Sequence, residues 1–165
     1  MNLREVRHRC ERLLEDIDLP NGFDADVFRD AVAARRNRAI RLVPREQMVG
    51  PCGVLVSLPT TDYVFFEAST SRVHRDHIVA HELGHLLCDH VPKKRMGDEV
   101  IRTLLPDLDP VMVRSALART TYGEVEEQEA EMIASLALGR RRAVAVDRLD
   151  PVMDRLHRTL GAGGA

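Results

Sequence analysis

The sequence has few cysteines and no long apolar run. Its three cysteines, Cys10, Cys52 and Cys88, are odd in number and not closely paired, which is not typical of a disulfide framework. No apolar run reaches the ~18 residues of a transmembrane helix, and the N-terminal residues lack the apolar segment of a secretory signal. We therefore expect a cytoplasmic protein that is not bound to a membrane and needs no disulfide.

Positive and negative charges are also nearly balanced. The chain has 24 basic and 26 acidic residues, a net charge of −2, so electrostatics give no reason to expect direct binding of nucleic acid or of an anionic membrane. The sequence shows no internal repeat and no low-complexity linker. A chain of 165 residues fits a single domain with its own hydrophobic core. The sequence does not indicate an oligomeric state.

Helical and β-rich segments follow one another in blocks. Apolar residues at helical spacing predict helices over 2–17 and from Asp24 to about Arg36. Three short β-rich segments predict strands at 39–43, 53–58 and 63–67. Further helices are predicted at 71–89, 97–104, 110–119, 124–141 and 147–160, with 141–165 forming a C-terminal helix and a flexible tail. A small three-stranded sheet with a mostly helical remainder is an α+β plan.

A metal-binding motif lies on the predicted helix 71–89. His81-Glu82-Leu83-Gly84-His85 is an HExxH pattern, and residues four apart share one helical face, so both imidazoles can reach one ion. Glu82 lies about 100° round the helix, where it can meet a water molecule activated by the metal. Zinc lowers the pKa of that water, and a carboxylate takes its proton as it attacks a carbonyl. The motif predicts His81 and His85 as zinc ligands and Glu82 as the catalytic general base.

The other face of this helix is apolar. Val79, Leu83, Leu86 and Leu87 form a stripe opposite the two histidines, which gives the helix a core side and a histidine side. Gly84 costs about 1 kcal/mol relative to alanine in an exposed helix. We therefore expect a strand or a substrate to approach closely at this position.

A catalytic zinc usually has three protein ligands and one open position, so a third ligand is required. The metzincin pattern fails, because Cys88 and Val91 stand where it needs Gly and His. His77 and Cys88 flank the site and can touch the ion, although a polar cleft-lining residue and a small buried hydrophobe are the simpler interpretations. His90 is expected to point away and to lie on the surface.

A better candidate for the third ligand lies on the later helix, which begins Glu124-Val-Glu-Glu-Gln-Glu-Ala-Glu131. Glu127 and Glu131 share one face, and Ala130 is small enough to let two helices approach. Glu127 can bind the metal while Glu131 holds a ligand histidine through its other ring nitrogen, or Glu131 can itself be the ligand. Solvation and the helix dipole also explain acidic clusters near a helix N-terminus, so the choice stays open here.

These segments resemble the ImmA/IrrE-type zinc metallopeptidases. The residues concerned are Tyr63-Val-Phe-Phe-Glu-Ala-Ser, Arg75 to His90 around the HELGH core, and Glu127-Gln-Glu-Ala-Glu-Met-Ile-Ala134; the resemblance covers about residues 25–140. It implies a zincin-like fold and a gluzincin-like site with Glu127 as third ligand. It also implies an endopeptidase that cleaves a helix-turn-helix transcriptional repressor and so derepresses stress or mobile-element genes. Glu131 stands where the family often has Asn.

Two functions remain to be compared. In the enzyme, the substrate lies along an edge strand at 63–67 by β-augmentation. Tyr122, His74 and His90 are candidates to stabilise the oxyanion, although a structural role is the simpler interpretation for each. The alternative is a non-proteolytic regulatory binding module of a toxin–antitoxin or phage-type operon, with a mainly structural zinc. Glu82 favours the enzyme, because a structural site needs no general base and usually has four protein ligands.

Overall fold

The computed structural model describes residues 2–17, 19, 22–48, 50–90, 94–95, 102–103, 106 and 117–139. Its main helices are α1 (Leu3–Glu15), α2 (Ala25–Arg36), α3 (Arg72–Leu87) and a further helix at 124–139. Its strands are β1 (Ala39–Arg45), β2 (Gly53–Ser57), β3 (Thr61–Glu67), β4 (Lys94–Arg95) and β5 (Leu117–Thr121). The fold class is α+β, as predicted. Within this part of the chain, no helix has the length and apolar character needed to cross a membrane.

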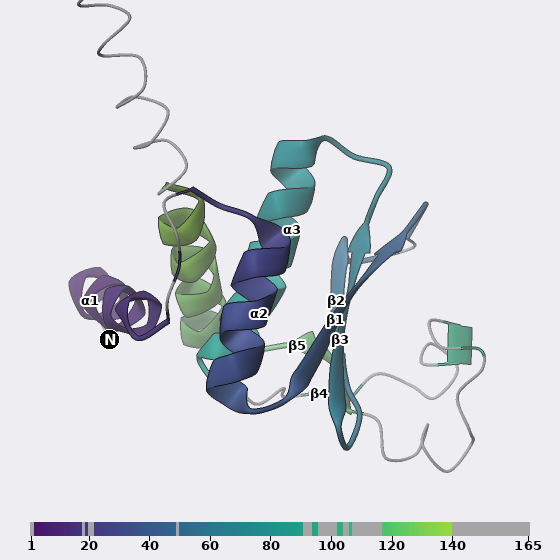
Figure 1. The fold of residues 1–165 in the computed structure, drawn as a ribbon, viewed down its shortest axis with the longest axis horizontal. Coiled ribbons are helices and arrows are strands. Elements are labelled where there is room, and N and C mark those ends of the chain that lie inside the picture. The colour runs from purple at the N-terminus through teal and green to yellow at the C-terminus, as the bar shows by residue number, and fades with distance from the viewer. Residues whose placement is uncertain are drawn as a thin grey trace, which may run out of the picture.

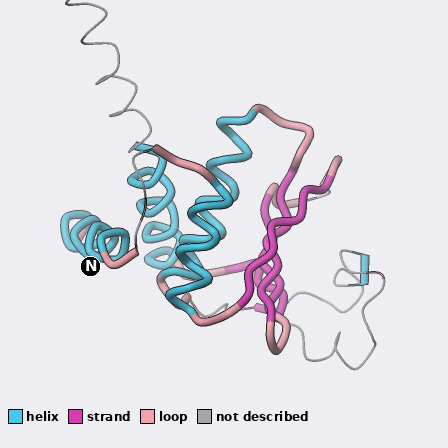
Figure 2. Tube along the Cα trace, in the orientation of Figure 1, coloured by secondary structure: helices cyan, strands magenta, loops and turns pink. Residues whose placement is uncertain are grey.

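The four main helices are stacked on one face of the sheet (Figure 1). α2 and α3 lie next to the strands, and α1 and the 124–139 helix lie farther out, as the cyan and magenta segments of Figure 2 show. α3 is therefore between the sheet and the 124–139 helix. This position allows its side chains to meet both layers.

Within the described residues, the sheet has five strands in the order β1-β3-β2-β5-β4, rather than the three predicted. All three predicted strands are present, and β5 and β4 continue the sheet beyond β2. The predicted helix 110–119 is wrong for its last three residues, because Leu117–Thr121 pairs antiparallel with β2. Pairing with an available strand overrides a weak helical preference. Apart from residues 102–103, which are helical, the predicted helices 97–104 and 147–160 and the tail 141–165 lie outside the described residues.

β3 is an inner strand, which changes the expected position of a substrate. It pairs in parallel with β1 along its whole length, from Ala39 opposite Thr61 to Arg45 opposite Glu67. Its other side pairs antiparallel with β2. The backbone hydrogen-bonding groups on both sides of β3 are thus paired with neighbouring strands. The expectation that residues 63–67 form an edge strand for a substrate is wrong.

The hydrophobic core extends into the first helix. Asn2 caps α1 in a reciprocal capping box with Glu5. Val6, Cys10 and Leu14 are at most 1% exposed and belong to the same cluster as residues of α2, α3 and the 124–139 helix. α1 is therefore part of the core, although it precedes the segment that carries the family resemblance.

Candidate metal centre

α3 has an apolar side and a histidine side, and both are covered by other parts of the fold. Ser71 caps its N-terminus by accepting a hydrogen bond from the His74 backbone N–H. The four residues of the predicted apolar stripe, Val79, Leu83, Leu86 and Leu87, are at most 2% exposed. The sequence thus correctly identified the side of the helix that faces the core.

Gly84 allows a second helix to approach, not the strand or substrate that was expected. A Cβ atom at this position would lie 3.1 Å from the Ala130 carbonyl oxygen and 3.2 Å from the Ala130 Cα. The small residues of both helices therefore let their backbones come close together. This contact brings the acidic start of the 124–139 helix over the histidines of α3.

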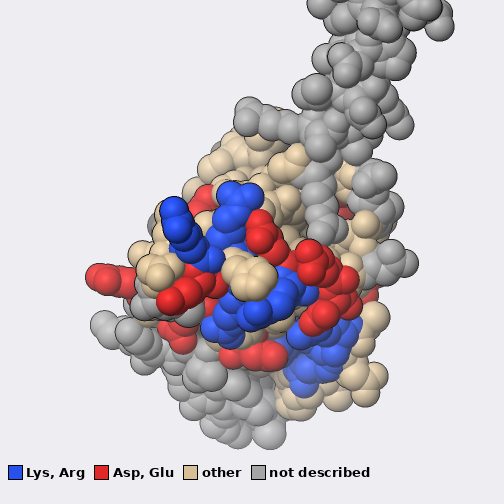
Figure 3. All heavy atoms as spheres, turned by 90° about the vertical axis from the view of Figure 1, so that its left-hand side faces the viewer, with Lys and Arg blue, Asp and Glu red and all other residues tan. Residues whose placement is uncertain are grey.

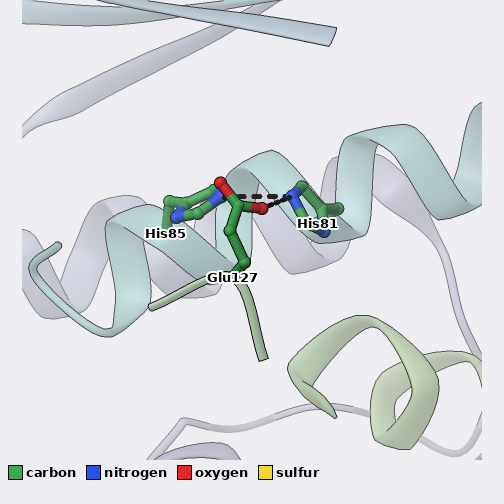
Figure 4. Close-up of side chains that lie close together, drawn as sticks. All are labelled: His81, His85 and Glu127. Atoms are coloured by element: carbon green, nitrogen blue, oxygen red, sulfur yellow. Dashed lines mark hydrogen bonds and ion pairs between the residues drawn. The ribbon is translucent and has the colours of Figure 1, made fainter. Parts of the chain in front are cut away.

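His81, His85 and Glu127 form one group whose ligand atoms face each other (Figure 4). The His81 Nε2 and His85 Nε2 atoms are 3.1 Å apart. Glu127 Oε2 lies 3.3 Å from His81 Nε2 and 3.8 Å from His85 Nε2. Figure 4 shows the Glu127 carboxylate reaching between the two imidazoles. Two successive turns of one helix and the first turn of another thus supply three convergent donors.

The dimensions of this triangle suit a zinc ion. Two ligand atoms on a tetrahedral zinc, each about 2.05 Å from the metal, lie about 3.3 Å apart. The observed separations of 3.1, 3.3 and 3.8 Å bracket this value. His85 is 1% exposed, whereas the Glu127 side chain is 46% exposed. A pocket of about 520 Å³ beside His81 and Glu127 opens to solvent, so the group is closed on one side and accessible on the other.

Glu131 lies behind one of the candidate ligands. Its Oε2 atom is 3.7 Å from His81 Nδ1, the ring nitrogen that faces away from the group. The same carboxylate is 3.0 Å from His77 Nε2. Glu131 and His77 are therefore paired with each other beside His81, and neither belongs to the convergent set of three.

The electrostatics favour a neutral His81. Burial lowers the pKa of this imidazole, and the nearby carboxylates of Glu127 and Glu131 oppose that shift. A histidine must be neutral to bind a metal. The local environment thus reduces the competition of protons with a metal ion.

Glu82 projects toward the sheet, where Gly53 makes room for it. Burial and, secondarily, the charge of Glu127 raise the pKa of Glu82 to about 8. A Cβ atom on Gly53 would lie 2.5 Å from the Glu82 Oε1 atom. Gly53 was not predicted as a residue of the site, although a glycine in a strand often marks a close approach.

The other candidate residues, Tyr122, Cys88 and His74, do not belong to the group of three ligand atoms. The Tyr122 ring stacks on the His85 ring with a centroid distance of 3.6 Å and an interplanar angle of 13°. Cys88 is buried against Cys10, and this contact and burial raise the pKa of its thiol, so it is a poor metal ligand. His74 is exposed and lies about 10 Å along the helix from His81.

His90 is buried, so the prediction of a surface histidine is wrong. It is 5% exposed, because α3 ends at Leu87 rather than continuing to residue 89. Asp89 adopts a left-handed conformation with φ of 54°, and the His90 N–H donates to the His85 carbonyl oxygen at 3.0 Å. This is a Schellman turn. It folds His90 back beneath α3, where its Nδ1 atom lies 2.9 Å from His85 Nδ1.

Comparison of the chain with protein-family models, with curated proteins and with solved structures found no match. The candidate centre is therefore defined by its own geometry: three ligand atoms from two helices, a buried carboxyl group beside them, and an open pocket.

Proposed function

We propose that this protein is a zinc-dependent endopeptidase of zincin-like fold, with His81, His85 and Glu127 holding the ion. The convergence of these three side chains supports the proposal most strongly. Three protein ligands with an accessible side are typical of a catalytic zinc site, whereas a structural site usually has four and is closed. The resemblance of the HELGH and later glutamate segments to ImmA/IrrE-type metallopeptidases points to the same chemistry.

The residues around the ion have separate tasks in this proposal. A bound zinc would act as a Lewis acid on the peptide carbonyl and lower the pKa of a water molecule. Glu82 accepts the proton of the attacking water and passes it to the leaving amine. A carboxyl group whose pKa is raised to about 8 can exchange protons near neutral pH, and a nearby cation favours its ionised form. Tyr122 and Glu131 hold the rings of His85 and His81.

Although β2 is also an inner strand, the proposed position of the peptide is beside its first two residues, where no pairing with β5 is observed in the described part of the chain. Leu55, Val56 and Ser57 of β2 pair with β5. Within the described residues, Gly53 and Val54 are not among the residues that pair with β5. Gly53 is also the residue in contact with Glu82. Main-chain pairing at this position would hold an extended substrate beside the general base. Pairing of the substrate with β2 therefore replaces the expected pairing with residues 63–67.

The proposed substrate is a protein in the cytoplasm, a helix-turn-helix transcriptional repressor whose cleavage derepresses stress or mobile-element genes. The family resemblance supports this class of substrate. On the face that carries α1, Arg side chains are interspersed with Asp and Glu (Figure 3), so the described part of this face does not form the continuous basic patch that binds nucleic acid. Arg7 and Glu11 form one such ion pair.

The test uses zinc-loaded wild-type protein, the regulator encoded beside its gene, and casein. We expect cleavage of the regulator at one or a few bonds and little cleavage of casein. The Glu82→Gln control should keep its zinc and lose at least about a hundredfold in rate. Proteolysis that is unchanged in Glu82→Gln would remove Glu82 from the mechanism. Tight regulator binding without any Glu82-dependent cleavage would instead indicate a non-proteolytic regulatory module with a structural zinc.

A further inference from the structure

A row of buried hydrogen bonds leads from His85 away from the proposed metal position. His85 Nδ1 lies 2.9 Å from His90 Nδ1, and His90 Nε2 lies 2.8 Å from Glu129 Oε2. Arg9 of α1 donates to the other carboxylate oxygen, Glu129 Oε1, at 2.6 Å. The three inner residues are at most 5% exposed. Side chains from α1, α3, the turn after α3 and the 124–139 helix thus meet in one network.

The donors and acceptors in this network define the direction of its hydrogen bonds, which run from His85 through His90 to Glu129. Glu129 forms an ion pair with Arg9, and a carboxylate in an ion pair only accepts hydrogen bonds. His90 must therefore donate from Nε2. A neutral imidazole has a single N–H, so His90 Nδ1 is the acceptor and His85 donates to it from Nδ1. The remaining His85 nitrogen, Nε2, then presents its lone pair to His81 and Glu127.

We infer that His90 and Glu129 are positioning residues that fix the His85 tautomer and ring orientation required for metal binding. The inference rests on the proposed metal centre. A ligand histidine held through its other nitrogen binds metal more tightly, and loss of such a partner typically costs 10–100-fold in affinity. Arg9 extends the network to α1, so the first helix contributes to the metal centre without touching it.

The same residues also allow a different interpretation, a second metal site. Cys88, His90 and Glu129 offer three ligand atoms close to one another. However, both nitrogens of His90 already face hydrogen-bond partners, and both oxygens of Glu129 are engaged by His90 and Arg9. A metal would have to break these contacts. The hydrogen-bonded network accounts for the buried polar atoms without an ion.

The first test measures the tautomers by ¹⁵N NMR of the histidine rings in zinc-free protein at neutral pH. We expect His90 to carry its proton on Nε2 and His85 to carry its proton on Nδ1. A His90 ring that is protonated on Nδ1, or on both nitrogens, would overturn the inference. This measurement does not depend on zinc, so it tests the direction of the hydrogen bonds separately from the proposed metal centre.

The second test measures zinc affinity in a matched pair of variants. An asparagine places an oxygen near the position of a histidine Nδ1, so His90→Asn keeps the acceptor for His85, whereas His90→Leu removes it. We expect zinc affinity to fall about 10–100-fold in His90→Leu and to be largely restored in His90→Asn. His90→Leu protein that folds and binds zinc as tightly as wild type would overturn the inference.

Two further outcomes separate the hypotheses. Wild-type protein that binds no zinc would refute the metal centre itself, and with it the role of the network in metal binding. A second zinc equivalent that disappears in His90→Leu would assign Cys88, His90 and Glu129 to a metal site and would overturn the positioning role.

Discussion

Glu127 and Glu131 are one helical turn apart but contact different atoms of the same imidazole. Glu127 Oε2 is 3.3 Å from His81 Nε2, within the convergent group. Glu131 Oε2 is 3.7 Å from His81 Nδ1, on the other side of the ring, and it pairs with His77. The two carboxylates therefore have different expected effects on metal binding.

We predict that Glu127→Ala weakens zinc binding more than Glu131→Ala. Loss of a direct ligand should exceed the roughly 10–100-fold effect of losing a group that only orients one. Glu124→Ala, which removes an exposed glutamate from the same helix, serves as the matched control and should bind zinc like wild type. Zinc titrations measure all three variants. A larger loss in Glu131→Ala would exchange the two roles.

The residues of the HExxH motif were predictable because helical spacing alone determines which of them share a face. The two candidate glutamates were predictable as a pair for the same reason. The buried contact between His90 and Glu129 was not predicted, because it depends on the left-handed turn at Asp89 and on packing between distant helices. A signal for Glu129 was present: it lies one turn before Ile133, on the buried side of its helix, and a charge on such a side requires a partner.

At the scale of elements, the candidate metal centre depends on how closely α3 and the 124–139 helix approach. The backbone of Ala130 occupies the space beside Gly84. Alanine would favour the helix by about 1 kcal/mol, but its methyl group would meet backbone atoms that cannot rotate away. Crowding of this kind typically costs 1–3 kcal/mol, so we expect it to outweigh the gain.

We therefore predict that Gly84→Ala lowers the free energy of unfolding and weakens zinc binding, because Glu127 shifts relative to the histidines. Gly139→Ala is the matched control, since a Cβ atom there has nothing within 4 Å and should be neutral or stabilising by up to about 1 kcal/mol. Denaturant unfolding and zinc titration measure both effects. Equal behaviour of the two variants would show that close helix approach does not position Glu127.

The end of β3 gives a pH-dependent prediction. The Glu67 carboxylate accepts hydrogen bonds from the Ser69 hydroxyl and the backbone N–H groups of Ser69, Met48 and Gln47, which lower the pKa of Glu67 to about 2. An unfolded glutamate titrates near a pKa of about 4.3. The stabilisation is therefore complete above about pH 4.3 and is lost as the pH falls toward 2.

Glu67→Gln should accordingly be less stable than wild type at neutral pH, and this difference should shrink as the pH falls from about 4.3 to about 2. Denaturant unfolding at several pH values measures the difference, with Glu46→Gln as a control for an exposed nearby glutamate. A difference that is constant with pH would mean that the charge of Glu67 is not involved.

At the scale of the whole molecule, the sequence predicted the class and most elements but not their arrangement. Apolar periodicity identified α1, α2, α3 and the first three strands. It contains no information on strand order, so the inner position of β3 and the addition of β5 beyond β2 were not predictable. Long-range pairing and the stacking of helices determine these features. They also place Glu127 over the histidines, although more than 40 residues separate them in the chain.

The central claim is that His81, His85 and Glu127 together hold one zinc ion. Titration of metal-free protein with zinc against a chromophoric chelator gives both stoichiometry and affinity. We expect about one zinc ion per chain in the wild type and in Glu82→Gln, and loss of tight binding in His81→Ala and His85→Ala. Wild-type protein that takes up no zinc, or a His85→Ala variant that binds zinc as tightly as wild type, would contradict the account.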